Sequence, residues 1–121
     1  MRKLLSIATA LSIMGSMSVA NALDYHHVSV VKNNRDTTTV VPGKDAYGRY
    51  GVKVDKGRAK ATLIERCSGG SEWEKHDIEI YSTTTNSSKQ DYWMKKGCQY
   101  RVELKGEDVE LAEAYVQNYT N

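Results

Sequence analysis

The sequence has no phenylalanine, one proline and two cysteines among its 121 residues. Without Phe, a hydrophobic core has to be filled by its other large side chains, and we expect Tyr50, Tyr100 and Trp93 to do so. The two cysteines are 31 positions apart with no nearby histidine pair, so they match no zinc-ligand spacing. They allow a single intramolecular disulfide, Cys67–Cys98.

A long apolar run is absent after the N-terminal segment. Residues 1–22 begin with Arg2 and Lys3, continue without charge, and end in the small-x-small pattern Ala20-Asn21-Ala22. We therefore expect a signal peptide at 1–22. Residues 23–121 are then one exported domain, periplasmic or secreted, which is not inserted in a membrane after cleavage. In such a compartment the two cysteines are expected to be oxidised.

Net charge is also absent from the expected mature chain. The signal peptide takes away two of the 17 basic residues, which leaves 15 against 15 acidic ones. A strongly basic nucleic-acid binder or a protein held on an anionic membrane is therefore disfavoured. The partners that remain are a protein or a carbohydrate.

What the chain does contain is strand signals. Apolar and polar residues alternate in several short segments bounded by Gly, Asn, Asp and Ser, and no long amphipathic helix occurs. Asp55-Lys56-Gly57 fits a hairpin loop with glycine in the left-handed position, and Ser82 to Ser88 fits a polar loop. The segments that we expect to be strands are 25–31, 37–41, 50–55, 58–67, 76–81, 98–104 and 109–116.

The last of these segments is ambiguous. As a strand it needs a β-bulge, because Val109 and Leu111 share one phase whereas Ala112, Ala114 and Val116 share the other. A helix at about 107–117 also fits the spacing and would make the domain α+β. The glycine turn before it favours a strand. We therefore predict an all-β domain, a small antiparallel β-sandwich or jelly roll of about seven or eight strands with one disulfide.

Residues 47–116 resemble the small β-sandwich modules appended to secreted bacterial enzymes, such as pre-peptidase C-terminal domains. The matching segments are Tyr50 to Gly57, Asp77 to Tyr81 and Met94 to Leu104, and the likeness lies in strand order and glycine turns. The resemblance implies a non-catalytic module, some of which bind calcium, collagen or carbohydrate. The acidic loop cluster of the calcium-binding modules is not evident here, so the resemblance assigns no ligand residue.

Catalytic patterns are not evident. Ser68-Gly69-Gly70-Ser71 lacks the G-x-S-x-G pattern of a nucleophile elbow. His26 and His27 point to opposite faces of a strand, so a metal site or general base would need His76 or a carboxylate from elsewhere. We predict neither an enzyme nor a cofactor or metal site.

Aromatic residues are the best candidates for binding. Exposed Trp and Tyr beside polar residues serve in sugar stacking and in protein interfaces. Trp93 fits either this role or the core. The candidate ligand-binding residues are Tyr47, Trp73, Tyr81, Tyr92 and Trp93.

The sequence thus predicts an exported, non-catalytic binding protein that recognises a carbohydrate or protein ligand at or outside the cell envelope. One alternative is a small periplasmic inhibitor or immunity-type partner of a secreted enzyme. Another is a minimal hydrolase or metal-binding protein that uses His76.

Overall fold

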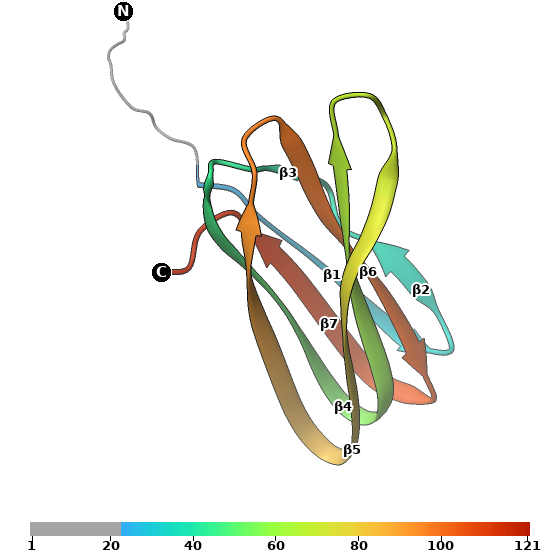
Figure 1. Cartoon of the computed structure of the whole chain (residues 1–121). Coiled ribbons are helices and arrows are strands. Elements are labelled where there is room, and N and C mark those ends of the chain that lie inside the picture. Colours follow the sequence, from blue (N-terminus) through green and yellow to red (C-terminus); the bar gives the residue numbers. More distant parts are fainter. Residues whose placement is uncertain (1–22) are drawn as a thin grey trace, which may run out of the picture.

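The computed structural model describes residues 23–121, which form seven strands and, within that range, no helix (Figure 1). The all-β fold class is therefore confirmed. The expected signal peptide, residues 1–22, lies outside the described residues. A helix long and apolar enough to cross a membrane does not occur in the described part of the chain. The strands are β1 (Tyr25–Lys32), β2 (Arg35–Thr37), β3 (Val41–Pro42), β4 (Ala46–Cys67), β5 (Glu72–Met94), β6 (Cys98–Glu107) and β7 (Val109–Gln117).

All seven strands belong to one antiparallel sheet with β4 at its centre. The first half of β4 pairs with β7 and the second half of β5, whereas its second half pairs with β6 and the first half of β5. Figure 1 shows β4 and β5 as nested U-shaped strands, because the sheet folds over on itself. The two halves pack together as a sandwich. The first half-sheet is β1, β7, residues 46–55 and residues 85–94. The second is β2, β3, β6, residues 57–67 and residues 72–82.

The fold line crosses the sheet where three of its chain segments have a positive φ. These residues are Lys32, Lys56 with Gly57, and Asp108. A Cβ atom on Gly57 would lie 2.5 Å from the carbonyl oxygen of Asp108, so the close approach at the fold requires glycine. The predicted hairpin loop at Asp55–Gly57 is thus wrong: these residues form a β-bulge inside β4, and the left-handed glycine serves to bend the strand.

The predicted loop at Ser82–Ser88 is also wrong. These residues lie in β5 and pair with β4, with Val52 opposite Ser88 and Val54 opposite Asn86. Thr84, Asn86 and Ser88 are in the same phase as the buried residues of β5 but are exposed, so this part of the strand buries no side chain. The alternation of apolar and polar residues that predicts a strand is therefore absent from Ser82–Ser88.

The core lies between the two half-sheets and takes residues from every strand except β2, at alternate positions in the longer strands. Tyr50 and Tyr100 are fully buried in it, as predicted. Trp93 is not: 45% of its surface is exposed, because it lies in the outward phase of β5, so its assignment to the core is wrong. Other members of the core are Val28, Val30, Val41, Val52, Val54, Ala59, Ala61, Leu63, Ile78, Ile80, Met94, Cys98, Val102, Leu104, Val109, Ala112, Ala114 and Val116.

The C-terminal segment is a strand, and the helix alternative is wrong. Its register shifts between the pairs Val30–Ala112 and Lys32–Val109, which is the irregularity that the change of phase predicted. The disulfide Cys67–Cys98 is also confirmed. It joins the end of β4 to the start of β6, where the two cysteines are direct cross-strand partners.

One carboxylate is buried beside the disulfide. Glu65 is 3% exposed, accepts a hydrogen bond from the hydroxyl of Tyr100, and lies 3.3 Å from the amine of Lys75. Burial is the main cause that raises the pKa of Tyr100, and the hydrogen bond to Glu65 is the second. These contacts satisfy the polar groups that the end of the core encloses.

Candidate functional site

The outer side of the first half-sheet brings together five ring-bearing side chains, which we call the aromatic face: Tyr25, His27, Tyr47, Trp93 and Tyr115. The strand registers place them. Tyr47 is directly opposite Trp93, and His27 is directly opposite Tyr115. Since opposite residues of an antiparallel pair project to the same side, residues from both ends of the chain meet on one surface.

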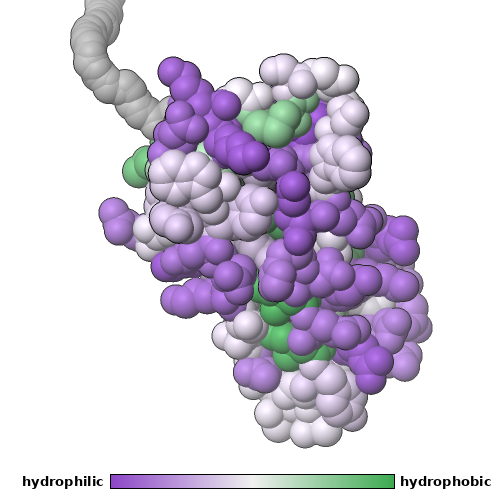
Figure 2. Space-filling view, in the orientation of Figure 1, coloured by the Kyte–Doolittle hydropathy of each residue, from purple (hydrophilic) through white to green (hydrophobic). Residues whose placement is uncertain are grey.

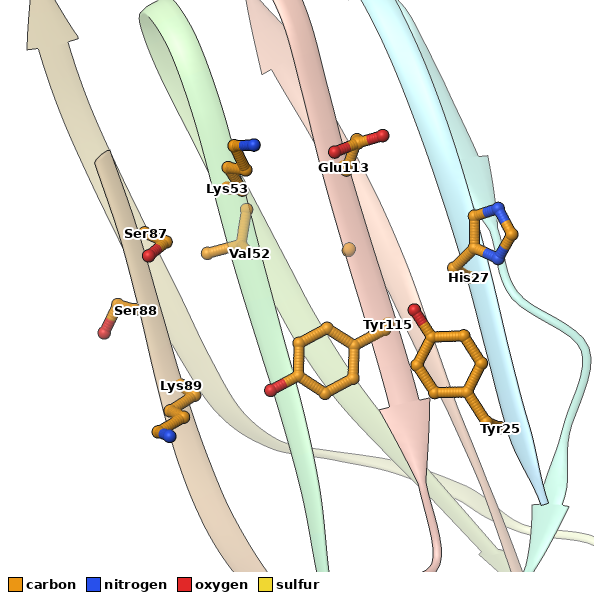
Figure 3. A pocket seen from close by; sticks show the side chains of 10 residues that line it. Tyr25, His27, Val52, Lys53, Ser87, Ser88, Lys89, Glu113 and Tyr115 are labelled. Carbon is orange, nitrogen blue, oxygen red and sulfur yellow. The ribbon is translucent and has the colours of Figure 1, made fainter. Parts of the chain in front are cut away.

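Tyr115 is the centre of this face. Its ring extends over β4 at Gly51, its cross-strand partner, where a Cβ atom would lie 2.6 Å from Cε1 of the ring. Tyr25 stacks beside it, with ring centroids 5.7 Å apart and ring planes 25° apart. Figure 3 shows the two rings side by side on neighbouring strands. The absence of a side chain at Gly51 thus allows Tyr115 to lie across the sheet as a platform.

A hollow of about 600 Å³ lies on this surface and is open to solvent. That size fits a small ligand. Tyr25 and Tyr115 line it together with polar side chains from β4, β5 and β7, among them Lys53, Lys89 and Glu113 (Figure 3). Within residues 23–121, no carboxylate oxygen lies within 4.0 Å of the amine of Lys53 or Lys89. Both ammonium groups are therefore available as hydrogen-bond donors.

An ion pair lies next to the platform. The Nε of Arg49 donates a hydrogen bond to Asp91 Oδ1 at 2.7 Å. This hydrogen bond is the main cause that lowers the pKa of Asp91 and raises the pKa of Arg49. Burial raises the pKa of the Tyr115 hydroxyl, and the charge of Arg49 opposes that rise. The pair therefore holds a planar cation and a carboxylate beside the aromatic rings.

Tyr47 and Trp93 form the second aromatic pair of this face. Their ring centroids are 5.2 Å apart in an edge-to-face arrangement, and both side chains are exposed. A second hollow of about 600 Å³ lies against them and against the C-terminal residues 118–121. Arg49 is the next outward-facing residue of β4 after Tyr47. Its partner Asp91 is the neighbouring outward-facing residue of Trp93 on β5. One polar pair thus separates two aromatic hollows.

The outer side of the second half-sheet is different in kind. It carries ion pairs, such as Arg35 with Glu103, Lys60 with Asp77 and Arg101 with Glu72. Its one exposed tyrosine, Tyr81, lies under the guanidinium of Arg58, at 5.8 Å from the ring centroid. Exposed charge of this kind keeps a surface solvated. The aromatic face is therefore specific to one half of the molecule.

The structure separates the five candidate residues named from the sequence. Tyr47 and Trp93 lie together on the aromatic face. Tyr81 is on the outer side of the other half-sheet, and Trp73 is exposed near the tip of the β4–β5 hairpin. Tyr92 is half-buried and packs against the core, with its ring 6.1 Å from that of Tyr100.

Sequence reasoning missed Tyr25, His27 and Tyr115. They belong to the first and last strands of the chain, so no local pattern links them. One signal was present: Tyr115 lies in the phase opposite to Ala112, Ala114 and Val116, which predicts an outward ring. The glycine that accommodates this ring is identified only by the strand register.

The histidines do not converge. His26 and His27 lie on β1, and His76 lies on β5, where its backbone carbonyl accepts a hydrogen bond from Tyr50. Within the described residues, the one cluster of three potential metal ligands is Glu65 with Cys67 and Cys98. Since the two sulfur atoms of this cluster form the disulfide, they are not thiolate ligands.

Comparison with known protein families, with curated proteins and with solved structures gives no match to this chain.

Proposed function

We propose that this protein is a non-catalytic binding protein that recognises a carbohydrate through its aromatic face, at or outside the cell envelope. The observation that carries the proposal is the Tyr25–Tyr115 platform beside the Arg49–Asp91 pair. A sugar ring has an apolar side formed by its C–H groups and a rim of hydroxyl groups. Flat aromatic rings stack against the first, and planar charged groups hydrogen-bond to the second.

The form of the surface supports the same ligand class. The two hollows lie on a rigid sheet and are open, which suits an extended chain whose successive sugar units contact successive aromatic groups. Tyr and Trp bury a large contact area with few rotatable bonds, so that little conformational entropy is lost on binding.

A glycan array tests the proposal with three variants. Tyr115→Ala removes the platform, and Trp93→Ala removes the second aromatic pair. Tyr81→Ala is the matched control, because it deletes an exposed aromatic ring from the other half-sheet. We expect wild type and Tyr81→Ala to bind the same glycans, and Tyr115→Ala to bind them about tenfold or more weakly. Equal losses in Tyr81→Ala and Tyr115→Ala, or no glycan bound by wild type, would contradict the proposal.

A second candidate function is that of a protein inhibitor or immunity-type partner. It is favoured by the exposed acidic residues Glu107, Asp108 and Glu110 near the fold line, an acidic cluster in which Glu110 is paired with Lys56 at 3.6 Å. Affinity capture of one stoichiometric enzyme, lost on reversal of these charges and retained in Tyr115→Ala, would select it over the carbohydrate proposal.

A further inference from the structure

Strand β5 leaves one whole edge of the folded sheet unpaired. It contains 23 residues, and its one strand partner is β4, which pairs with it on both sides of a register shift at Thr83 and Thr84 (Figure 1). The backbone groups on its other side therefore have no strand partner among residues 23–121. An edge of this kind is a template for pairing with another strand.

The middle of this edge has none of the charged side chains or prolines that usually prevent such pairing. From Tyr81 to Ser88 it has no charged residue, no proline and no glycine, and it includes three β-branched threonines. The register between β4 and β5 shifts here, with Thr83 and Thr84 opposite Lys56. None of the β5 residues has a positive φ, and the buried residues of β5 keep even positions on both sides of the shift, so β5 itself continues to alternate. In Figure 2 the end of the molecule where β5 bends is pale, neither strongly hydrophilic nor strongly hydrophobic. This stretch suits a backbone-to-backbone contact.

We propose that the occupant of this edge is the β5 edge of a second copy of the chain, paired antiparallel about a two-fold axis at Thr83. In an antiparallel pair, two residues opposite each other either both form the inter-strand hydrogen bonds or both do not, and the two kinds alternate along a strand. Two copies of the same edge can therefore pair only with odd-numbered residues opposite odd-numbered ones and even-numbered residues opposite even-numbered ones. A two-fold axis at Thr83 satisfies this requirement. It also gives an isologous contact, the usual form of a homodimer.

The charged residues on β5 favour this register over the registers shifted by two residues. With Thr83 opposite Thr83 of the second copy, Lys89 is opposite Asp77, and Asp91 is opposite Lys75 at the β-bulge of β5. By symmetry each of these attractive pairs occurs twice. Within one chain Asp77 already lies 3.9 Å from Lys60, Lys75 3.3 Å from Glu65 and Asp91 2.7 Å from Arg49. Lys89 has no such partner among residues 23–121, so the pair of Lys89 with Asp77 contributes most to the choice of register. A shift of two residues in one direction places Lys89 opposite Lys75, and in the other direction Asp91 opposite Asp77. Like charges directly opposite each other destabilise a strand pair.

The fold geometry is compatible with this arrangement. A two-fold axis along the sheet normal at the bend keeps the inner side of each copy inward, so that the second copy continues the same folded sheet. The aromatic rings stay on the outer side, whereas Lys89 of the first hollow and Asp91 of the Arg49–Asp91 pair lie at the edge of the contact. Dimer formation itself needs no ligand in that hollow, so its test is separate from the glycan array.

Two cysteine variants test the register in the purified protein. Thr83→Cys places two thiols at the axis. Ser87→Cys is the matched control, because each Ser87 is opposite Glu79, eight residues from Ser87 of the other copy. After mild oxidation we expect a reducible dimer for Thr83→Cys and almost none for Ser87→Cys. Equal cross-linking of the two variants, or none in Thr83→Cys, would overturn the register.

Two lysine variants test the dimer itself by light scattering over a range of protein concentrations. Thr83→Lys puts two ammonium groups together at the axis and is expected to weaken dimerisation more than about tenfold. Ser87→Lys puts the same side chain opposite Glu79 and is expected to leave the dimer intact. A wild-type protein that stays monomeric at every concentration, or a Thr83→Lys dimer as stable as wild type, would refute the proposal. Far-ultraviolet circular dichroism verifies that each variant keeps its strands.

Discussion

Gly51 and Tyr115 are cross-strand partners, and the ring of Tyr115 occupies the space that a side chain at Gly51 would need. The φ of Gly51 is not positive, so glycine is required here for space and not for backbone conformation. The pair joins the centre of the sheet to the aromatic face. A mutation beneath the ring therefore reports on the position of the platform.

Gly51→Ala should destabilise the wild-type protein by about 1–3 kcal/mol, because the added methyl group displaces the ring. In a Tyr115→Ala background the same substitution should cost clearly less, because the ring is gone and of these close contacts the backbone oxygen of Ser88, 3.0 Å from the added methyl group, remains. Urea unfolding of the four proteins measures this coupling. An equal cost of Gly51→Ala in both backgrounds would show that the ring does not lie over β4.

Removal of the disulfide should cost about 3–4 kcal/mol of the free energy of unfolding in the chain-entropy description. The bond closes a loop between residues 31 positions apart, which are direct cross-strand partners. Unfolding of the double variant Cys67→Ala and Cys98→Ala, compared with the oxidised wild type, measures the loss. A loss below about 1 kcal/mol would mean that the unfolded chain is already constrained near these positions.

Stability should fall in alkaline solution because of Tyr50 and Tyr100. Burial raises the pKa of both hydroxyl groups. The unfolded state therefore releases these protons above about pH 10, whereas the folded state retains them. The contribution of these two hydroxyl groups to the free energy of unfolding is fully present below about pH 10 and is lost as the pH rises further.

The variant Tyr50→Phe isolates one of these two protons. The part of the pH slope that tyrosine causes should be shallower than in wild type, since one proton that the folded state retains is removed while those of Tyr100 and Tyr115 remain. Urea unfolding at several pH values between neutral and strongly alkaline provides the slopes. Parallel slopes for the two proteins would contradict the assignment to Tyr50.

The sequence predicted the parts of the fold that depend on local alternation. Residues 98–104 and 58–67 are strands, the disulfide joins them, and Tyr50 and Tyr100 are buried. Three assignments were wrong: the hairpin at Asp55–Gly57, the loop at Ser82–Ser88 and the core position of Trp93. In each case the same local chemistry is compatible with two structures. Asp55-Lys56-Gly57 has the residues of a hairpin turn, but the same left-handed glycine permits a bulge that bends a continuous strand. Whether the chain reverses there depends on long-range pairing with β5 and β7.

The candidate site was less predictable for the same reason. Tyr47 and Trp93 were identified as exposed aromatic residues, although nothing in their local sequence indicated that they face each other. Tyr25 and Tyr115 are 90 positions apart and meet only because β1 and β7 pair. Trp73 has the same exposed character as Trp93 but lies at a different end of β5. Composition identifies the residue types of a binding face, and strand register decides which of them share it.

The most direct test of the account is a nuclear magnetic resonance titration with the glycan that binds most tightly on the array. The protein has two tryptophans, so that two indole N–H signals report on two places: Trp93 on the aromatic face and Trp73 near the hairpin tip. We predict that the Trp93 signal shifts and saturates while the Trp73 signal stays in place. A saturating shift of Trp73 with Trp93 unchanged would contradict the assignment of the binding site.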